Sequence, residues 1–444
     1  MRILLAVHGF PPTHYAGAER VAERIVKGLV ARGHDVEVFT VESVSTPGFR
    51  VETTPEDGFI VHRLYYDVKE GDTFQNLYDY PPIGDALRRI LQRRHFDLVH
   101  LISGYLLGSQ VAQVAREANL PFVITLTEYW FMCPRLNLMH PNDSLCSGPE
   151  NDNKCARCLF EEKRRYRIPA QVAPNLMNAF WLLAQQAHFT TTKAEAIAQR
   201  REKLRRTLES ADLVISPSRF LIDKFAEFGF DTRRFELIRH GMNKPAFTPR
   251  EPTARAPGEL RLGYIGQIKA HKGVDLIIEA VLPLLDTGEK IRLDLWGPDG
   301  EVPEYADRLK EQTAAYPSIH WNGRYDGARV WDILMGFDVL IVPSRWYENS
   351  PLVILEAMHT GLPVIATRLG GMAEMVQHEK SGLLFGLNNA PDLRAQIARL
   401  LREPGLLDRL RDGVPPVKQS EQELEEIFAH YARLVEQESD FLKT

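Results

Sequence analysis

The chain has 444 residues, of which 44% are hydrophobic and 25% are charged, a composition typical of a globular protein with about two or three domains. The formal net charge of -5 at pH 7 gives no reason to expect a nucleic-acid partner. The apolar run at 1–7 is too short for a signal peptide, and no later stretch is long enough to predict a membrane span. We therefore expect a cytoplasmic α/β protein.

The chain opens with a strand–helix–strand pattern. Residues 3–7 form an apolar run that predicts a buried strand, apolar residues recur at helical spacing over 18–31, and 36–40 predicts a second strand. Gly17 lies in the turn before the helix, where the lack of a side chain lets the backbone approach a phosphate closely. Many such turns carry a glycine for geometry alone, so this residue by itself decides nothing.

Two further buried strands are predicted at 97–101 and 121–125, each with a polar end. His100 lies in the first of them. We favour a hydrogen-bonded core histidine over a catalytic one at this position, because its neighbours on both sides are apolar.

All 4 cysteines of the chain lie in one loop-like segment rich in Pro, Gly and Asn, with the spacing C-x12-C-x8-C-x2-C. Four thiolates suit a tetrahedral zinc ion, which would order a loop that has no core of its own. The alternatives are reduced thiols, an iron–sulfur cluster and, only in a secreted protein, disulfides. Zinc is the favoured interpretation, as a closed structural site and not a catalytic one, with the ligands Cys133, Cys146, Cys155 and Cys158.

The segment 160–206 is predicted to be helical and basic, with ten Lys and Arg against four Asp and Glu. Its middle, 178–184, is apolar and aromatic. One interpretation is a surface for an anionic membrane or a lipid-linked acceptor. In that case we expect the positive charge to come from Arg200, Arg201, Arg205 and Arg206. The other is a solvated insertion that packs its apolar stripe on the domain.

A proline-rich stretch marks the expected domain boundary. We place an N-terminal domain at 1–245, including a Cys-rich loop at 133–158 and the helical insertion at 160–206. A linker follows at 246–259, and then a C-terminal domain at 260–420. The tail 421–444 has apolar residues at helical spacing and predicts an amphipathic helix.

The second domain begins with a predicted strand at 260–265, followed by a short turn that contains Gln267 and Lys272. A lone lysine is normally exposed to solvent, but this one lies where a strand passes into a helix. A strand at 319–322 leads to Arg324 and Tyr325.

A second strand–loop–helix–strand unit occupies 338–376. Its strand at 339–342 ends in a loop that carries Glu348, and a second acid, Glu356, lies inside the following helix. Ser350 is the expected cap and Pro351 the expected first residue of that helix. In parallel sheets such a loop lies at the ligand-binding edge, and a helix N-terminus there suits a phosphate.

This pattern resembles the donor-site signature of retaining glycosyltransferase family 4. The features that carry the resemblance are Glu348 and Glu356 with seven residues between them, Ala-Met at 357–358, Gly-x-Pro-Val at 361–364 and Gly-Gly-x-x-Glu at 370–374. The family has the GT-B fold, in which two Rossmann-like, doubly wound domains face each other across a cleft. The resemblance therefore implies that fold, with the last helix crossing back to the first domain.

The resemblance also implies roles for single residues. Glu348 would contact the transferred sugar and Glu356 the ribose, while Lys272 would hold the diphosphate, which makes Glu348 and Lys272 the candidate catalytic pair. The remaining candidates for binding the donor are Gly17, Gln267, Arg324, Tyr325, Ser350, Pro351 and Leu352.

The sequence departs from the family pattern at several of these places. Gln267 stands where the family has an arginine, and Lys269 or His271 could supply the missing charge. Thr127 and Glu128 replace the family's His-Asp after the 121–125 strand.

The function implied is metal-independent transfer of a sugar, with retention, from a nucleotide-diphosphate sugar to an acceptor, in cell-surface polysaccharide or glycolipid synthesis. The alternatives are a nucleotide-sugar epimerase of the same fold and a non-catalytic protein that binds nucleotide sugars.

Overall fold

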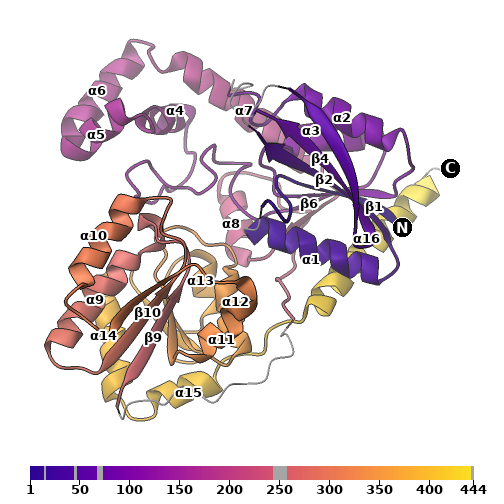
Figure 1. Cartoon of the computed structure of the whole chain (residues 1–444). Coiled ribbons are helices and arrows are strands. Elements are labelled where there is room, and N and C mark those ends of the chain that lie inside the picture. The colour runs from indigo at the N-terminus through magenta and orange to yellow at the C-terminus, as the bar shows by residue number, and fades with distance from the viewer. Residues whose placement is uncertain (15–16, 45–47, 68–73, 244–257, 442–444) are drawn as a thin grey trace. The chain divides into compact units, whose positions relative to one another are not determined.

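The computed structural model describes residues 1–14, 17–44, 48–67, 74–243 and 258–441, with the side chains of 439–441 left out (Figure 1). The chain divides into two compact units. Unit 1 comprises residues 1–240 together with the C-terminal segment from Ser420, and unit 2 comprises Gly241–Gln419. The expected linker at 246–259 lies outside the described residues except for its last two positions.

Unit 1 is built on an eight-stranded sheet with the order β3-β4-β2-β1-β5-β6-β7-β8. Neighbouring strands are parallel except for the antiparallel pair β3–β4. Since β2 and β5 lie on opposite sides of β1, the chain reverses its direction of travel across the sheet at β1. The strands are β1 (Arg2–Val7), β2 (Asp35–Ser43), β3 (Arg50–Glu56), β4 (Phe59–Tyr66), β5 (Leu98–Ile102), β6 (Phe122–Thr125), β7 (Leu213–Ser216) and β8 (Phe235–Leu237).

Helices connect these strands and cover the sheet. Among them, α7 packs against α3 and α4, and α5 packs against α6. Figure 1 shows α5 and α6 set apart from the strands of unit 1 and joined to them through α4 and α7. The helices are α1 (Gly17–Ala31), α2 (Pro81–Leu91), α3 (Gly108–Glu117), α4 (Asp152–Glu161), α5 (Arg164–Val172), α6 (Pro174–Gln186), α7 (Thr191–Glu209), α8 (Arg219–Glu227) and α16 (Ser420–Phe441).

The C-terminal helix α16 is an integral part of unit 1. Its apolar residues Leu424, Ile427 and Tyr431 lie in the same buried cluster as α1 and β1. Gly28 of α1 permits this close approach, because a Cβ there would lie 2.1 Å from Leu424 Cδ1. The helix is also fixed by polar contacts, since the buried carboxylate of Glu423 accepts a hydrogen bond from Arg24 at 2.8 Å.

His100 belongs to the core that α16 completes. Its Nδ1 is 2.5 Å from the hydroxyl of Tyr431, and its Nε2 is 2.8 Å from Thr125 Oγ1. Burial lowers the pKa of His100 to about 3, so the ring is neutral at pH 7. The structure therefore places His100 as a hydrogen-bonded core residue.

Unit 2 is built on a six-stranded parallel sheet with the order β11-β10-β9-β12-β13-β14. Its strands are β9 (Leu260–Ile265), β10 (Ile291–Trp296), β11 (Ile319–Gly323), β12 (Val339–Val342), β13 (Val364–Thr367) and β14 (Gly382–Phe385). Its helices are η1 (Ala270–Lys272), α9 (Val274–Asp286), α10 (Pro303–Thr313), η2 (Gly327–Arg329), α11 (Val330–Met335), α12 (Leu352–His359), α13 (Gly370–Met375), α14 (Ala390–Arg402) and α15 (Leu406–Asp412).

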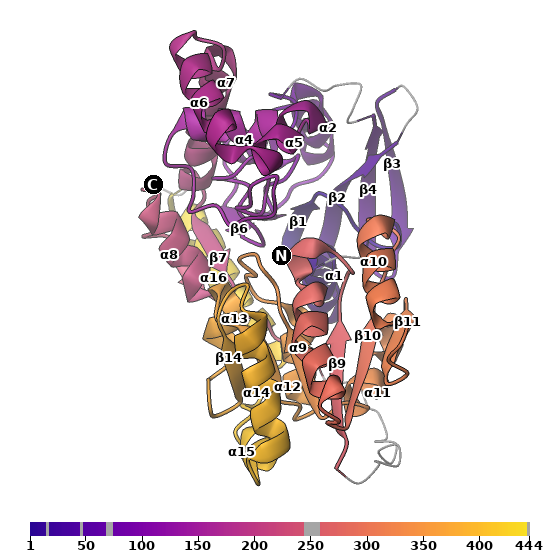
Figure 2. The same ribbon diagram turned by 90° about the vertical axis from the view of Figure 1, so that its left-hand side faces the viewer.

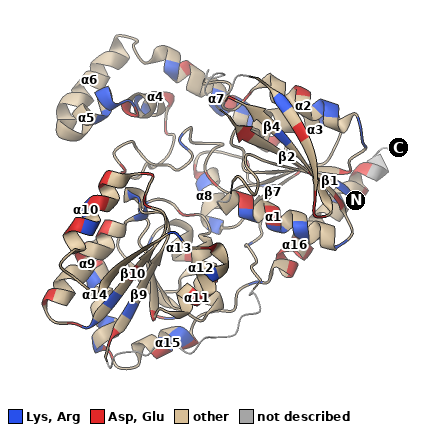
Figure 3. Ribbon diagram, viewed as in Figure 1, with Lys and Arg blue, Asp and Glu red and all other residues tan. Residues whose placement is uncertain are grey.

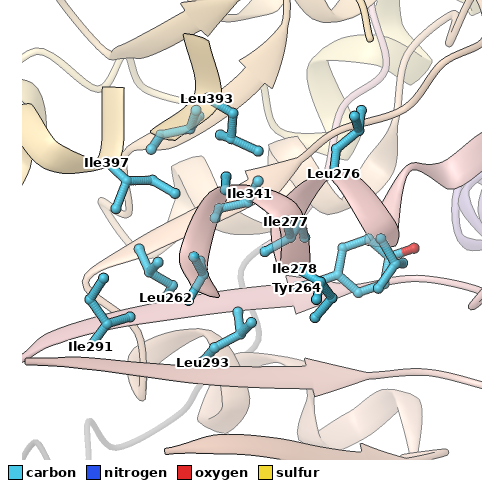
Figure 4. Close-up of a cluster of buried hydrophobic side chains, with 14 of the residues drawn as sticks. Leu262, Tyr264, Leu276, Ile277, Ile278, Ile291, Leu293, Ile341, Leu393 and Ile397 are labelled. Carbon is cyan, nitrogen blue, oxygen red and sulfur yellow. The ribbon is translucent and has the colours of Figure 1, made fainter. Parts of the chain in front are cut away.

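Both faces of this sheet are covered, as a parallel sheet requires. On one face, Leu262 and Ile341 pack with residues of α9 and α14, as Figure 4 shows. On the other, Leu340 and Val342 pack with residues of α11, α12 and α13. Successive residues of β12 therefore enter opposite cores. The predicted fold class of two doubly wound α/β units with a C-terminal helix is confirmed.

No helix in the described part of the chain is long and apolar enough to cross a bilayer.

Candidate functional site

The candidate site lies at the carboxyl edge of the unit 2 sheet, between β9 and β12. From β9 the chain proceeds to β10 and β11 on one side, whereas β12 begins the other half of the sheet. The loops that leave β9 and β12 therefore run in opposite directions at this switch point, which is the place where doubly wound sheets bind ligands.

An ion pair joins the two loops at this point. Lys272, after β9, places its Nζ 2.6 Å from Oε1 of Glu348, after β12. The same oxygen accepts hydrogen bonds from Ser344 Oγ at 2.8 Å and from Trp346 Nε1 at 2.7 Å. Within the described residues Oε2 of Glu348 has no hydrogen bond, and it is not among the buried oxygens without a partner. One carboxylate oxygen thus anchors the side chain, and the other is open to a ligand.

These contacts keep Glu348 ionised. Burial alone would raise the pKa of this carboxyl, since only 8% of the residue is exposed. The charge of Lys272 and the hydrogen bonds from Lys272, Ser344 and Trp346 outweigh burial, and the pKa of Glu348 lies below its usual range. The site therefore presents a fixed negative charge beside a fixed ammonium group at neutral pH.

Two glycines set the backbone of these loops. Gly273 has a φ of +75°, and a Cβ there would lie 2.1 Å from the carbonyl oxygen of Pro343. At Gly371 a Cβ would lie 1.8 Å from the carbonyl oxygen of Asn349, and the Gly371 N–H donates to the carbonyl of Glu348 at 2.7 Å. Only glycine allows α9 and α13 to press against the Glu348 loop so closely.

The second acid, Glu356, is buried in α12, with 3% of the residue exposed. It lies four residues after Leu352, the first helical residue, and therefore one turn along the same side of the helix. The expected cap was wrong by one position: Pro351 is the N-cap, with an extended backbone, and no side chain caps the helix. Ser350 therefore precedes the cap and does not form it.

The cationic substitutes expected near Gln267 do not supply a free charge. Gln267 Nε2 donates to Glu301 Oε1 at 2.9 Å, and the ammonium of Lys269 pairs with Glu301 as well. Burial, reinforced by the charges of Lys272 and Lys269, lowers the pKa of His271 to about 4, so this ring is neutral at pH 7. Lys272 therefore remains the principal cation of the turn.

The candidates Arg324 and Tyr325 follow β11, two strands away from β9 in the sheet. Arg324 is exposed, and Tyr325 is half-buried with its ring edge-on to Trp296 at 6.2 Å. They share the carboxyl edge with the ion pair but do not touch it.

Sequence reasoning missed Ser344 and Trp346, although their position in the loop after a buried strand was a usable signal.

Unit 1 has a polar cluster at its own switch point. His8 follows β1 and lies 3.3 Å from buried Glu19, and Ser103, after β5, donates to Glu128, after β6, at 3.0 Å. Burial raises the pKa of Glu128 to about 7 despite hydrogen bonds from the Trp130 N–H and Ser103. Gly17 begins α1, and a Cβ there would meet no atom within 4 Å. Its neighbours 15–16 lie outside the described residues.

The four cysteines converge on one small cavity of about 20 Å³, which is lined by all of them. This is room for one water-sized particle. All four are free thiols, and burial raises the pKa of Cys155 and Cys158 to about 12. Cys146 Sγ donates to the carbonyl of Gly148 at 3.6 Å. In the described ranges no three His, Cys, Asp or Glu side chains are arranged to hold a metal ion.

Of the four arginines of α7 that the sequence suggested as an exposed basic surface, Arg200 is buried, Arg201 and Arg205 are half-buried, and Arg206 is exposed. Arg200 is 1% exposed, donates to the carbonyl of Trp130, and lies over its indole ring at 4.1 Å. Arg201 pairs with Asp152 at 2.6 Å. The other two are engaged as well, because Arg205 donates to the carbonyl of Gly229 at 2.5 Å and Arg206 pairs with Glu202 at 2.7 Å. Arg200 and Arg205 thus hold α7 to the rest of unit 1, whereas Arg201 joins α7 to α4 and Arg206 pairs within α7.

The ion pair of the site generates a prediction about pH. In Lys272→Met, burial should dominate and lift the pKa of Glu348 above its usual value of about 4.3. A carboxyl with a depressed pKa stabilises the folded state above its unfolded pKa and loses that effect as pH falls. The loss of Tm caused by Lys272→Met should therefore be largest near about pH 7 and shrink towards about pH 4.

Thermal unfolding of the full chain across this pH range checks the expectation. The matched control is Lys272→Met in a Glu348→Gln background, where the pH dependence should disappear because no carboxyl remains to titrate. An equal loss of Tm at every pH would show that Lys272 acts through packing and not through the charge of Glu348.

Comparison with known proteins agrees with this geometry. A model described as Glycosyltransferase Family 4 matches residues 15–142, and one described as Glycosyl transferases group 1 matches residues 259–403. A D-inositol 3-phosphate glycosyltransferase of Streptomyces bingchenggensis (strain BCW-1) is 29% identical over 222 residues, which are 46% of this chain and 48% of that protein. The chain thus spans about half the length of this curated relative.

Solved structures resemble the whole chain. A sucrose-phosphate synthase of Thermosynechococcus elongatus matches with a TM-score of 0.65 and 19% identity over 98% of this chain and 99% of its own. The Anabaena protein HepE, in complex with UDP-glucose, matches with a TM-score of 0.55 and 15% identity over 100% and 99%. At such identities the likeness shows the fold. The two family models, one in each unit, together cover more than half of the residues, and the chain is accordingly a glycosyltransferase of family 4 with the GT-B fold.

Proposed function

We propose that this protein transfers a sugar, with retention and without a catalytic metal, from a nucleotide-diphosphate sugar to an acceptor. The observation that carries the proposal is the Lys272–Glu348 pair at the switch point of unit 2, with one oxygen of Glu348 open. A fixed cation and a fixed carboxylate side by side suit a ligand that has a diphosphate at one end and sugar hydroxyls at the other.

Each candidate residue has a role in this proposal. Lys272 and the backbone N–H groups at the start of α12 bind the diphosphate, because both offer positive charge. Glu348 accepts hydrogen bonds from the transferred sugar through Oε2, and buried Glu356 accepts them from the ribose. Arg324 and Tyr325 bind the base. By family resemblance, the residues Gly17, Gln267, Ser350, Pro351 and Leu352 complete the donor contacts.

The chemistry requires that the leaving group be stabilised. The bond between the anomeric carbon and the phosphate oxygen breaks, and the nucleoside diphosphate departs with the electron pair. Lys272 and the helix terminus neutralise the charge that develops on it. The acceptor hydroxyl attacks from the same face and passes its proton to the departing phosphate oxygen, which gives retention. Glu348 holds the sugar in position during this exchange.

We propose further that the acceptor is lipid-linked or a glycan, in cell-surface polysaccharide or glycolipid synthesis, and that the α5–α6 hairpin contacts an anionic membrane. Leu176, Phe180 and Leu183 follow one another at helical spacing on α6, and 74%, 41% and 66% of these residues are exposed. Figure 3 shows α6 without a charged residue. An apolar stripe of this kind on a water-exposed helix is typical of interfacial binding.

Charge supports the same surface. The sequence from 163 to 194 contains no Asp or Glu, and Lys163, Arg164, Arg165 and Arg167 lie together at the start of α5. This group replaces the α7 arginines as the basic part of the proposed contact. Figure 2 shows the same hairpin from a second side.

A structural zinc ion at the four cysteines is the last part of the proposal. The donor types fit the metal, because four thiols from a loop and α4 line one small cavity, and the ion would have to draw them into ligand positions that they do not occupy in the described structure. Cys133, Cys146, Cys155 and Cys158 would hold the ion, which would join the loop to α4 and take no part in catalysis.

Two substitutions separate the donor roles. Glu356→Ala should weaken binding of the free nucleotide by about 10- to 100-fold, since hydrogen bonds to a charged group are worth about 1.5–3 kcal/mol. Glu348→Gln should lower kcat far more than nucleotide affinity, because its partner is the sugar. Calorimetry with nucleoside diphosphates and nucleotide sugars, together with turnover assays, measures both.

The same assays test the rival functions. An epimerase would convert the donor sugar in the absence of any acceptor, and a non-catalytic protein would bind the donor without ever releasing nucleotide. Unchanged nucleotide affinity in folded Glu356→Ala would refute the ribose assignment. Equal loss of free-nucleotide binding in Glu348→Gln would mean that this residue shapes the loop instead of holding the sugar.

We expect one zinc per chain in protein purified without a chelator, as measured by elemental analysis. Cys155→Ser with Cys158→Ser should abolish the metal and lower the Tm, because the loop loses its link to α4. Absence of metal from the wild-type protein would contradict the proposal. So would four cysteines that all react readily with a thiol reagent in the native state.

Flotation with vesicles tests the membrane contact. Binding should require anionic lipid and weaken with salt, because exposed charges are screened over about 8–10 Å at physiological ionic strength. Leu176→Ser with Leu183→Ser should reduce binding strongly. The matched control replaces Val302 and Leu387 with Ser, since these exposed apolar residues lie in unit 2. Equal binding by both double variants, or no binding by the wild-type protein, would refute the hairpin as the contact.

A further inference from the structure

The helical insertion contains a cavity that the donor site does not explain. It has a volume of about 220 Å³ and lies between the start of α4 and the inner side of α6. This is more than ten times the ~10–15 Å³ that a single water molecule needs. Its lining includes the side-chain amides of Asn151, Asn153, Asn178 and Gln185.

The wall of the cavity includes a buried donor without a partner. Trp181 is 4% exposed, and its indole N–H has no hydrogen bond within the described part of the chain. Because leaving a buried donor unpaired is energetically costly, such a group usually marks a place where another molecule completes the bond. The ring is held in place by Phe160, stacked at 5.7 Å, and by Tyr166 at 5.4 Å.

Two side-chain amides on the same face of α6 also lack a hydrogen-bond partner in the described part of the protein. Asn178, Trp181 and Gln185 are spaced by three and four residues and so line one side of α6. Both residues are exposed to solvent, and among the described residues their side chains make no hydrogen bond with the protein. Three donor groups, two of which can also accept, therefore face the cavity from a single rigid element.

The two cations of the lining are each paired with a carboxylate, which argues against an anionic ligand. Arg157 pairs with Glu161 at 2.8 Å, and Lys154 pairs with Glu150 at 2.9 Å. Both cations of the lining are therefore already satisfied, and an anion gains little there. Leu182 adds an apolar edge. The amides and the indole N–H match hydroxyls on the rim of a neutral ring, and the apolar edge matches C–H groups on its faces.

We propose that this cavity binds a neutral saccharide unit, as a subsite for the acceptor of the transfer reaction. The role of the bound sugar as an acceptor rests on the proposed function. Binding of a sugar in the cavity does not depend on that function. Asn178 and Gln185 hydrogen-bond the hydroxyls, and the Trp181 indole donates to a ring or hydroxyl oxygen. The subsite selects the acceptor, since the donor residues lie in unit 2.

The experiment titrates the full chain, labelled with ¹⁵N, with methyl α-glucoside, methyl α-galactoside and methyl α-mannoside. The chain has 6 Trp, and Trp181→Phe identifies the indole signal of Trp181. At least one glycoside should shift that signal in a saturable manner. Asn178→Ala and Gln185→Ala should each weaken the binding by about 5- to 10-fold, which is the usual effect of losing one hydrogen bond.

Matched controls lie next to both residues on the same helix. Asn175→Ala and Gln186→Ala change the same residue types at positions that are likewise exposed but do not line the cavity, and should leave affinity unchanged. The proposal is overturned if no glycoside shifts the Trp181 signal. It is also overturned if the control variants weaken binding as much as Asn178→Ala and Gln185→Ala.

Turnover assays separate this proposal from the proposed function. With a saccharide acceptor, Gln185→Ala should raise KM for the acceptor and leave kcat and KM for the nucleotide sugar unchanged. A saturable Trp181 shift in a chain that transfers no sugar would uphold the cavity and refute the transfer reaction. If Gln185→Ala transfers sugar with the same acceptor KM as the wild-type protein, the transfer reaction is upheld and the cavity is refuted as an acceptor subsite.

Discussion

A buried carboxylate must have partners, and in unit 2 this constraint fixes the site. Glu348 lies at a switch point where two loops diverge, so its partners come from both of them: Lys272 after β9, and Ser344 and Trp346 from its own loop. The charge of Lys272 and the hydrogen bonds from Lys272, Ser344 and Trp346 together outweigh the cost of burial and keep the carboxylate ionised. A second ion pair, from Arg345 to Asp275 at 2.7 Å, also ties the loop after β12 to the segment after β9, but only Lys272 contacts the buried carboxylate of Glu348 with a charge.

Gly273 and Gly371 allow the loops around the Lys272–Glu348 pair to pack closely. Gly371 lets α13 approach until its N–H reaches the carbonyl of Glu348, and Gly273 lets α9 start against the carbonyl of Pro343. A side chain at either position would push the loops apart by displacing backbone atoms. The glycines of the family signature thus have a physical role, because they let the neighbouring loops approach the Lys272–Glu348 pair closely.

Much of this could be predicted from the sequence, because local patterns determine it. Apolar runs ending in Gly or Pro predicted the parallel strands, and the position of Glu348 in the loop after one of them predicted the edge on which the site lies. The pairing of Lys272 with Glu348 could not be predicted, since 75 residues separate them and nothing local relates them. The same holds for Arg200, which looks like a surface charge in sequence but is buried against Trp130.

The start of α12 shows a smaller failure with a clear cause. Ser350 and Pro351 are favourable residues for a helix start, yet the helix begins at Leu352 because Pro351 is extended. The cavity between α4 and α6 was beyond sequence reasoning altogether. Its amides come from a loop and two helices, and only the fold shows that the Trp181 N–H is left without a partner.

The most direct measurement of the central claim is the anomeric configuration of the product. The full chain is incubated with α-linked nucleotide sugars and saccharide acceptors in buffer free of added divalent cations, and again with Mg²⁺, and the new linkage is followed by ¹H NMR. We expect an α-linked product, formed at the same rate in both buffers, because Lys272 and the α12 terminus neutralise the leaving group. A β-linked product, or transfer that requires Mg²⁺, would contradict the account.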